Sequence, residues 1–209
     1  MVAVTQADTN FRRPRSDAKR RAILNGAKAV FLKNGFGGTS MDAVAAKAGV
    51  SKMTVYRHFE CKETLFAGVI TELCERIIDD DLEAMPGRSP REALRAFAKK
   101  MVAIVFSPET IELHRIVIAE SRRFRKLGRM FYQTGPDRCI SALAAYLEKN
   151  VDDPRFKVRD PRRSAEEFLE VLRGYAHLRV LLGVEPMPSA REMEARVEGA
   201  VQHVLAYPE

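Results

Sequence analysis

Beyond Lys62, apolar residues recur at three- and four-residue intervals, the spacing that places them on one face of an α-helix. No stretch there shows the strict alternation of apolar and polar residues that predicts a half-buried strand. Proline and glycine divide the pattern into separate segments. The pattern predicts helices over about 62–83, 90–106, 108–124, 128–150, 161–182 and 189–207.

The ends of these segments carry their own signals. Ser89-Pro90 and Ser107-Pro108 mark helix starts, because serine caps a helix and proline suits its first turn. Pro86-Gly87 closes the helix that starts at about Lys62, and Gly135-Pro136 predicts a kink or a break. Polar residues 152–159 are predicted to form a loop.

Two short helices joined by a glycine turn are predicted between residues 39 and 62. Thr39 and Asp42 match the Ser/Thr-x-x-Asp/Glu capping pattern, so the first of these helices should start at Thr39. Gly49 ends it, since glycine enters the left-handed conformation without a Cβ penalty. Ser51 can cap the second helix. This arrangement is a helix-turn-helix, which predicts DNA binding.

In the second helix of this motif, Val55 and Phe59 are predicted to face the first helix. The opposite face then carries side chains with hydrogen-bond donors and hydroxyl groups. Such side chains reach phosphates and base edges when a helix lies in the major groove. We expect Lys52, Met53, Thr54 and Arg57 at base edges, although Thr54 could also bind a phosphate. The expected phosphate contacts are Tyr56, His58, Lys62 and the Thr39-Ser40 cap. The predicted DNA-binding residues are Thr39, Ser40, Ser51, Lys52, Met53, Thr54, Tyr56, Arg57, His58 and Lys62.

Residues 48–66 read Ala-Gly-Val-Ser-Lys-Met-Thr-Val-Tyr-Arg-His-Phe-Glu-Cys-Lys-Glu-Thr-Leu-Phe. With residues 23–36 ahead of it, this stretch resembles the N-terminal domain of the TetR family of bacterial transcriptional regulators. The resemblance implies an all-α fold, with a three-helix DNA-binding domain and a C-terminal helical domain for ligand binding and dimerisation. It also implies a homodimer, most often a repressor, that binds a palindromic operator and is released by a small-molecule effector.

Charge supports DNA binding independently of that resemblance. Residues 1–62 hold 12 Lys and Arg against 4 Asp and Glu, whereas the remaining residues hold 23 against 24. An excess of positive charge that coincides with a groove-reading motif indicates a phosphate footprint. We expect a flexible basic arm over 1–15, a helix-turn-helix domain over 16–62 and an effector-binding and dimerisation domain over 63–209.

The composition, 46% hydrophobic over 209 residues, is that of an ordinary globular chain. Three cysteines, none in Cys-x-x-Cys spacing, argue against a disulfide framework or a zinc site and fit a reducing cytoplasm. No apolar run approaches the roughly 18 residues of a membrane span, and no secretory signal follows the N-terminal arginines. We therefore expect a cytoplasmic protein.

Enzyme motifs are missing from the sequence. It contains no His-Glu-x-x-His, no Gly-x-Ser-x-Gly and no Gly-x-x-x-x-Gly-Lys phosphate loop. The histidines at 58, 114, 177 and 203 are spaced like no metal site. We predict a protein that is no enzyme and that needs neither metal nor cofactor.

The C-terminal region offers apolar and polar positions for an effector cavity, although each residue type is more often core or surface. Residues 113–124 and 127–132 are similar to the C-terminal domain of one TetR subgroup whose members tend to regulate efflux or stress genes. The predicted effector residues are Met101, Phe106, Leu113, His114, Val117, Glu120, Phe131, Tyr132, Arg138, Tyr175 and His177.

The last two predicted helices carry more apolar surface than one buried face needs. One interpretation is a core helix that is apolar all round. The alternative, favoured because TetR-like proteins typically dimerise in this way, is a two-fold four-helix interface. The predicted interface residues are Val171, Gly174, Leu178, Leu181, Val197, Ala200, Val201 and Val204.

Two other functions share the helix-turn-helix. A constitutive or architectural DNA-binding protein would have an occluded or absent cavity. A redox-responsive regulator would use Cys61, which stands at the predicted start of a helix beside Lys62, where the helix dipole and the cation favour a thiolate. The simpler interpretation is that Cys61 replaces a small capping residue.

Overall fold

The computed structural model describes residues 12–78 and 89–205, with side chains from residue 16 onward. The described residues form ten α-helices and no strand, which confirms the predicted all-α fold. An isolated bridge pairs Phe156 with Leu205. The chain divides into two compact units, Met1–Val69 and Ile70–Glu209, which are described separately below.

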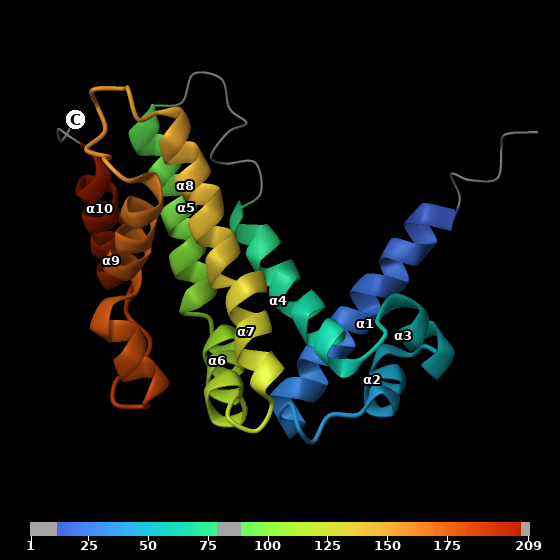
Figure 1. Ribbon diagram of the computed structural model, residues 1–209. Helices are drawn as coiled ribbons and strands as arrows, with labels where there is room; N and C mark the ends of the chain where they lie inside the picture. Colours follow the sequence, from blue (N-terminus) through green and yellow to red (C-terminus); the bar gives the residue numbers. More distant parts are fainter. Residues whose placement is uncertain (1–11, 79–88, 206–209) are drawn as a thin grey trace, which may run out of the picture. The chain divides into compact units, whose positions relative to one another are not determined.

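The helices of the two units are labelled in Figure 1. In the N-terminal unit, α1, α2 and α3 precede α4, which continues into the C-terminal unit. The bounds are α1 Arg12–Asn34, α2 Met41–Ala48, α3 Lys52–His58, α4 Lys62–Ile78, α5 Pro90–Val105, α6 Pro108–Glu120, α7 Arg125–Thr134, α8 Pro136–Lys149, α9 Pro161–Leu181 and α10 Ala190–Val204.

Three aromatic rings form the centre of the N-terminal unit. Phe31, Phe36 and Phe66 are fully buried, and the Phe66 ring meets the other two edge-on with centroids 5.0 and 5.6 Å apart. Offset and edge-to-face pairs of this kind add to the free energy gained by burying the rings. The cluster ties α1 and the turn after it to α4.

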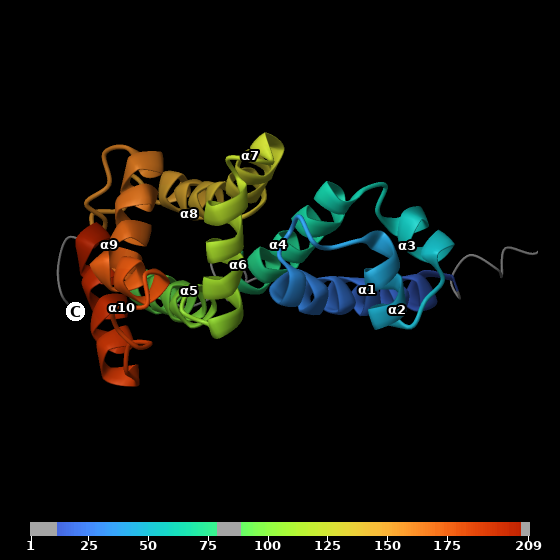
Figure 2. The same cartoon turned by 90° about the horizontal axis from the view of Figure 1, so that it is seen from below.

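The C-terminal unit packs α5, α8, α9 and α10 around a shared core. Phe97 of α5 and Phe168 of α9 are fully buried, with ring centroids 6.3 Å apart. Arg115 of α6 donates to the carbonyl oxygens of Val180 and Leu181, at 2.8 and 2.9 Å, and so satisfies acceptors at the end of α9. Figure 2 shows α9 and α10 side by side.

Several helix ends match the sequence signals. Ser89 and Ser107 accept hydrogen bonds from the first turns of α5 and α6, and Gly135 separates α7 from α8 as the predicted break. The helix predicted to reach 124 ends at Glu120, and the predicted end of the helix starting at Lys62 lies outside the described residues. The backbone of residues 12–15, predicted to belong to the arm, is helical; residues 1–11 are outside the described part.

Candidate DNA-binding helix and effector cavity

The turn between α2 and α3 has the geometry that the sequence predicts, shifted by one residue at its start. Ser40 is the cap of α2, because its Oγ accepts from the Ala43 N–H at 3.1 Å. Thr39 is buried, and its hydroxyl donates to the Gly35 carbonyl at 2.7 Å. Thr39 therefore holds the preceding turn, which corrects its predicted capping role, and its phosphate contact stays a prediction.

Gly49 ends α2 in the left-handed conformation, with φ 66° and ψ 33°. Ser51 caps α3 by accepting from the Thr54 N–H at 3.2 Å, and the two hydroxyl oxygens lie 2.8 Å apart. A glycine turn between two capped helices is the local structure that a helix-turn-helix requires.

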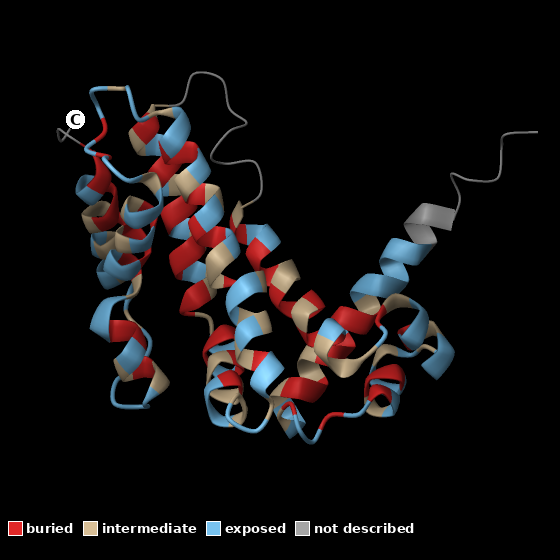
Figure 3. Cartoon of the chain, viewed as in Figure 1, coloured by how far each residue is buried: buried red, intermediate tan, exposed pale blue. Residues whose placement is uncertain are grey.

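The outward face of α3 is polar and open. Val55 and Phe59 are buried, whereas Ser51, Lys52, Met53, Tyr56 and Arg57 are exposed. Met53 is 77% exposed, so its apolar side chain is free to contact a thymine methyl group. Figure 3 colours the chain by burial and marks the exposed residues of α3 in pale blue.

Lys52 is partly engaged within the motif. Its Nζ lies 2.8 Å from the Asp42 carboxylate of α2, which raises the pKa of Lys52 through a hydrogen bond and charge attraction. Both side chains are well exposed, so this ion pair contributes little to stability and can be exchanged for a base edge.

Two predicted phosphate contacts are less accessible than the sequence suggests. The Nε2 of His58 is buried without a hydrogen-bond partner among the described residues, and burial, then the charge of Arg57, lowers the pKa of His58. Lys62 lies over the Phe36 ring, with Nζ 4.7 Å from its centroid, and donates to the Gly37 and Thr39 carbonyls at 3.3 and 3.0 Å. Lys62 therefore also stabilises the turn before α2.

Two basic residues of α1 add to the positive charge beside α3. The Arg20 guanidinium lies 5.6 Å from the Phe59 ring centroid, and the charges of Arg20 and Lys19 both act on His58. Both side chains are exposed. Both belong to the basic region of the sequence, but their place near α3 could not be predicted, because it depends on how α1 packs.

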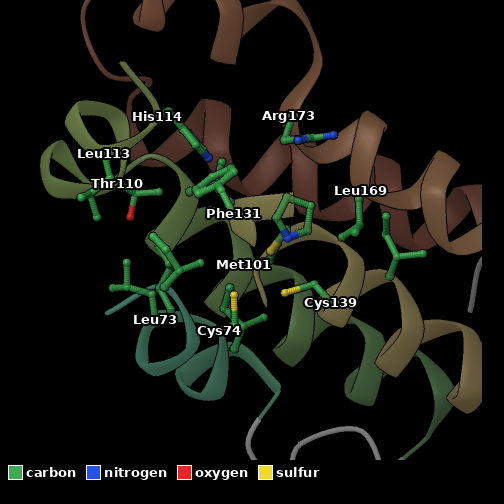
Figure 4. A pocket seen from close by; sticks show the side chains of 17 residues that line it. Leu73, Cys74, Met101, Thr110, Leu113, His114, Phe131, Cys139, Leu169 and Arg173 are labelled. Atoms are coloured by element: carbon green, nitrogen blue, oxygen red, sulfur yellow. The ribbon is translucent and has the colours of Figure 1, made fainter. Parts of the chain in front are cut away.

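A cavity of about 60 Å³ lies within the C-terminal unit (Figure 4). Its wall is mainly apolar and comes from α4 to α9. The lining residues are Ile70, Leu73, Cys74, Ile77, Met101, Ile104, Val105, Thr110, Leu113, His114, Phe131, Gly135, Pro136, Cys139, Ile140, Leu169 and Arg173.

The polar groups of this cavity lie on α6 and α9. His114 packs edge-on against Phe131 and against His177, with ring centroids 5.1 and 5.0 Å apart. Burial, then the charges of His177 and Arg173, lowers the pKa of His114 to about 3, so its ring is neutral at pH 7. The His114 Nδ1 is buried with no hydrogen-bond partner among the described residues. Arg173 is paired with Glu170.

Four of the predicted effector residues line this cavity: Met101, Leu113, His114 and Phe131. Phe106 and Val117 are buried outside its lining, and His177 is its neighbour through the His114 ring. The exposed side chains of Tyr132, Arg138 and Tyr175, and the half-buried Glu120, do not line it, and their effector-binding role stays a prediction. The part of the wall from α4, and the cysteines Cys74 and Cys139, were not predicted from the sequence.

The predicted dimer interface divides into two sets. Val171, Gly174 and Leu178 are exposed on α9 and Leu181 is half-buried, and all but Val171 line a surface hollow with Tyr175, which is 78% exposed. On α10, Val197, Ala200, Val201 and Val204 are at most 1% exposed in the single chain. The α10 stripe therefore packs within the protomer core, which corrects its predicted place against a partner.

Three smaller observations complete the description of possible sites. Cys61 directly precedes α4, where its backbone N–H donates to Thr64 Oγ1 at 3.2 Å. Within residues 12–78 and 89–205, no cluster of His, Cys, Asp and Glu could hold a metal ion. None of the described helices is both long and apolar enough to cross a membrane.

Comparison with known proteins gives two family matches. Residues 23–69 match the family described as bacterial regulatory proteins of the tetR family. Residues 92–207, more than half of the chain, match the C-terminal domain of AefR-like transcriptional repressors. The uncharacterised HTH-type transcriptional regulator YhgD of Bacillus subtilis is 26% identical over 136 residues, which cover 65% of this chain and 68% of YhgD. Other curated regulators match over 35–58% of their length.

Solved structures match over more of the chain. A TetR-family transcriptional regulator from Mesorhizobium loti is 30% identical with a TM-score of 0.72, covering 90% of this chain and 95% of that one. The flavonoid-responsive regulator FrrA is 34% identical with a TM-score of 0.66, covering 88% of this chain and 93% of that one. With its capped helix-turn-helix and helical C-terminal unit, this chain belongs to the TetR family of bacterial transcriptional regulators.

Proposed function

We propose that the protein is a repressor that binds a palindromic operator as a homodimer and releases it when a small molecule occupies the cavity of the C-terminal unit. The exposed face of α3 carries the proposal, because it presents a lysine, an arginine, a tyrosine and a methionine on a helix that is capped at Ser51. Charged and hydroxyl-bearing side chains on such a helix read base edges and phosphates.

Lys52 and Arg57 are the proposed base-reading residues, and Lys19 and Arg20 extend the phosphate contacts along α1. Selection of bound fragments from genomic DNA would identify the operator. Lys52→Ala should then weaken operator binding by roughly 1–3 kcal/mol and relax the base preference at one position. Removal of a phosphate-binding side chain would instead weaken binding to all DNA sequences by about the same amount.

Lys47→Ala is a matched control, since Lys47 is an exposed lysine of α2 outside the recognition face. It should reduce binding to operator and random DNA alike, or leave both unchanged. Equal losses on operator and random DNA for Lys52→Ala would show that Lys52 does not read bases.

The cavity supports an effector that is neutral, mainly apolar and carries a hydroxyl group. A hydroxyl can donate to or accept from the unpartnered His114 Nδ1, whichever ring nitrogen holds the proton. This chain is similar to the flavonoid-responsive regulator FrrA, and this similarity supports an aromatic ring compound as the effector. At about 60 Å³ the cavity is far below the 300–1,000 Å³ typical of ligand sites, so ring compounds require the side chains of the wall to move.

A matched ligand pair tests this effector class. We expect 7-hydroxyflavone to raise the melting temperature of the protein more than flavone does, because only the first carries the hydroxyl. His114→Phe should remove that difference while preserving the ring packing against Phe131. Equal stabilisation of the wild type by both compounds would contradict a role for His114 in effector binding.

A constitutive DNA-binding protein without an effector is the competing function. It predicts no cavity that a ligand could enter, and the lined cavity beside an unpartnered His114 nitrogen favours the ligand-responsive function instead.

A further inference from the structure

Two cysteines from distant parts of the chain meet at the cavity wall. Cys74 lies on α4 and Cys139 on α8, and their exposed fractions are 6% and 1%. Both residues line the cavity, and each thiol shifts the pKa of the other. Figure 4 shows the two sulfurs on this wall, with His114 and Arg173 also at the cavity.

The two thiols are chemically unequal. Hydrogen bonding from Cys139, together with the charge of Arg138, lowers the pKa of Cys74 against the opposing effect of burial. The same contact and burial raise the pKa of Cys139. The thiolate is the nucleophilic form of cysteine, so Cys74 is the sulfur that attacks an oxidant first. Cys139 is the sulfur that reacts with the oxidised Cys74 in the second step.

The cavity is suited to a small reagent. A water molecule needs about 10–15 Å³ of such space, so about 60 Å³ admits a molecule the size of hydrogen peroxide without rearrangement. The thiols can therefore be reached by a reagent of this size.

We propose that Cys74 and Cys139 are a peroxide-sensitive thiol pair that closes to a disulfide between α4 and α8. The Cys74 thiolate attacks one peroxide oxygen, the O–O bond breaks, and the departing hydroxide takes up a proton to leave as water. The resulting sulfenic acid at Cys74 is attacked by the Cys139 sulfur, which forms the S–S bond and releases a second water. Two thiols are oxidised by two electrons and one peroxide is reduced to two waters.

Closure changes the position of α4. An S–S bond is about 2.05 Å long, so closure brings the two sulfurs into covalent contact and links α4 to α8 at this point. Because α4 continues into the N-terminal unit, this movement can change the affinity for DNA. That consequence rests on the proposed function, whereas the formation of the disulfide does not.

Intact-mass analysis of the full-length protein before and after hydrogen peroxide tests the chemistry. The wild type should lose two hydrogens per chain, regain them with dithiothreitol, and yield one cross-linked peptide pair containing Cys74 and Cys139. Cys61→Ser is the matched control and should behave like the wild type, because Cys61 lies apart from the cavity lining. In Cys139→Ser, the sulfenic acid at Cys74 should persist and react with dimedone.

A wild-type protein that keeps three free thiols after peroxide, or a disulfide that includes Cys61, would overturn the proposal. Peptide mapping of the wild type decides this even if a cysteine variant folds poorly. Binding to selected operator DNA is measured separately on the oxidised wild type and on oxidised Cys74→Ser. Disulfide formation without a difference in DNA binding would leave the thiol chemistry standing and reject its coupling to DNA release.

Discussion

Burial of the imidazole rings of His114 and His177 makes stability depend on pH. The pKa of His114 is lowered to about 3 and that of His177 to about 4, with burial as the main cause in both cases and Arg173 opposing protonation of each. The unfolded chain, with histidine pKa values near 6.5, takes up protons first as the pH falls. Each ring should therefore reduce the free energy of unfolding by about 2 kcal/mol between pH 7 and pH 5.

Urea unfolding of the wild type, His114→Gln and His177→Gln at both pH values checks this prediction. Each variant should lose about 2 kcal/mol less than the wild type on acidification, whatever its stability at pH 7. If both variants lose as much as the wild type, groups other than these two rings cause the pH dependence.

The sequence predicts which residues of one helix are exposed better than it predicts which residues of different helices lie together. The outward positions of α3 follow from helical periodicity once Val55 and Phe59 face inward, so Lys52, Met53 and Arg57 were placed correctly on the surface. The contact between Cys74 and Cys139 could not be predicted, because it depends on how α4 packs against α8.

At the scale of helices, two glycines hold backbone conformations that differ in how readily other residues replace them. Gly49 has φ 66° and ψ 33°, and a Cβ there would meet no atom within 4 Å, so Gly49→Ala should cost only backbone strain of about 1–2 kcal/mol. Asn tolerates this left-handed conformation and should cost less. Gly174 has φ 48° and ψ −164°, a region that is essentially restricted to glycine, so Ala and Asn should both cost roughly 1–3 kcal/mol.

Denaturant unfolding of the four variants Gly49→Ala, Gly49→Asn, Gly174→Ala and Gly174→Asn measures this difference. The expected pattern is partial recovery by Asn at 49 and none at 174. A Gly174→Asn protein as stable as the wild type would show that α9 can straighten without loss.

Helix starts and stops were predicted from local chemistry, whereas the break inside α9 was not. Ser89, Ser107 and Gly135 act through hydrogen bonds or backbone angles within their own turn, so the sequence contains their effect. The residues around Gly174 keep a helical pattern, and the break depends on contacts such as that with Arg196 of α10. The α10 stripe was assigned to a partner because an apolar face does not indicate which surface covers it.

For the whole molecule, the exposed apolar side chains of α9 determine where a second copy can bind. Tyr175 is 78% exposed and Leu178 47%, and Leu182 and Val184, just beyond the helix, are 69% and 68% exposed. A contiguous apolar surface of this kind marks an interaction site. In a two-fold interface the same surface occurs on both subunits, so one substitution changes the contact twice.

Leu178→Glu should therefore convert the proposed dimer to a monomer, because it places two carboxylates in a surface that must lose water on association. Light scattering at micromolar concentration measures the mass, and Tyr132→Glu serves as control because Tyr132 is an exposed aromatic residue on α7. A complete palindrome requires the two recognition helices of a dimer to lie about 34–36 Å apart. The monomer should therefore lose affinity for the palindrome and keep its weak affinity for a single half-site. If Leu178→Glu stays dimeric while Tyr132→Glu dissociates, the interface lies on α7 and the assignment to α9 is rejected.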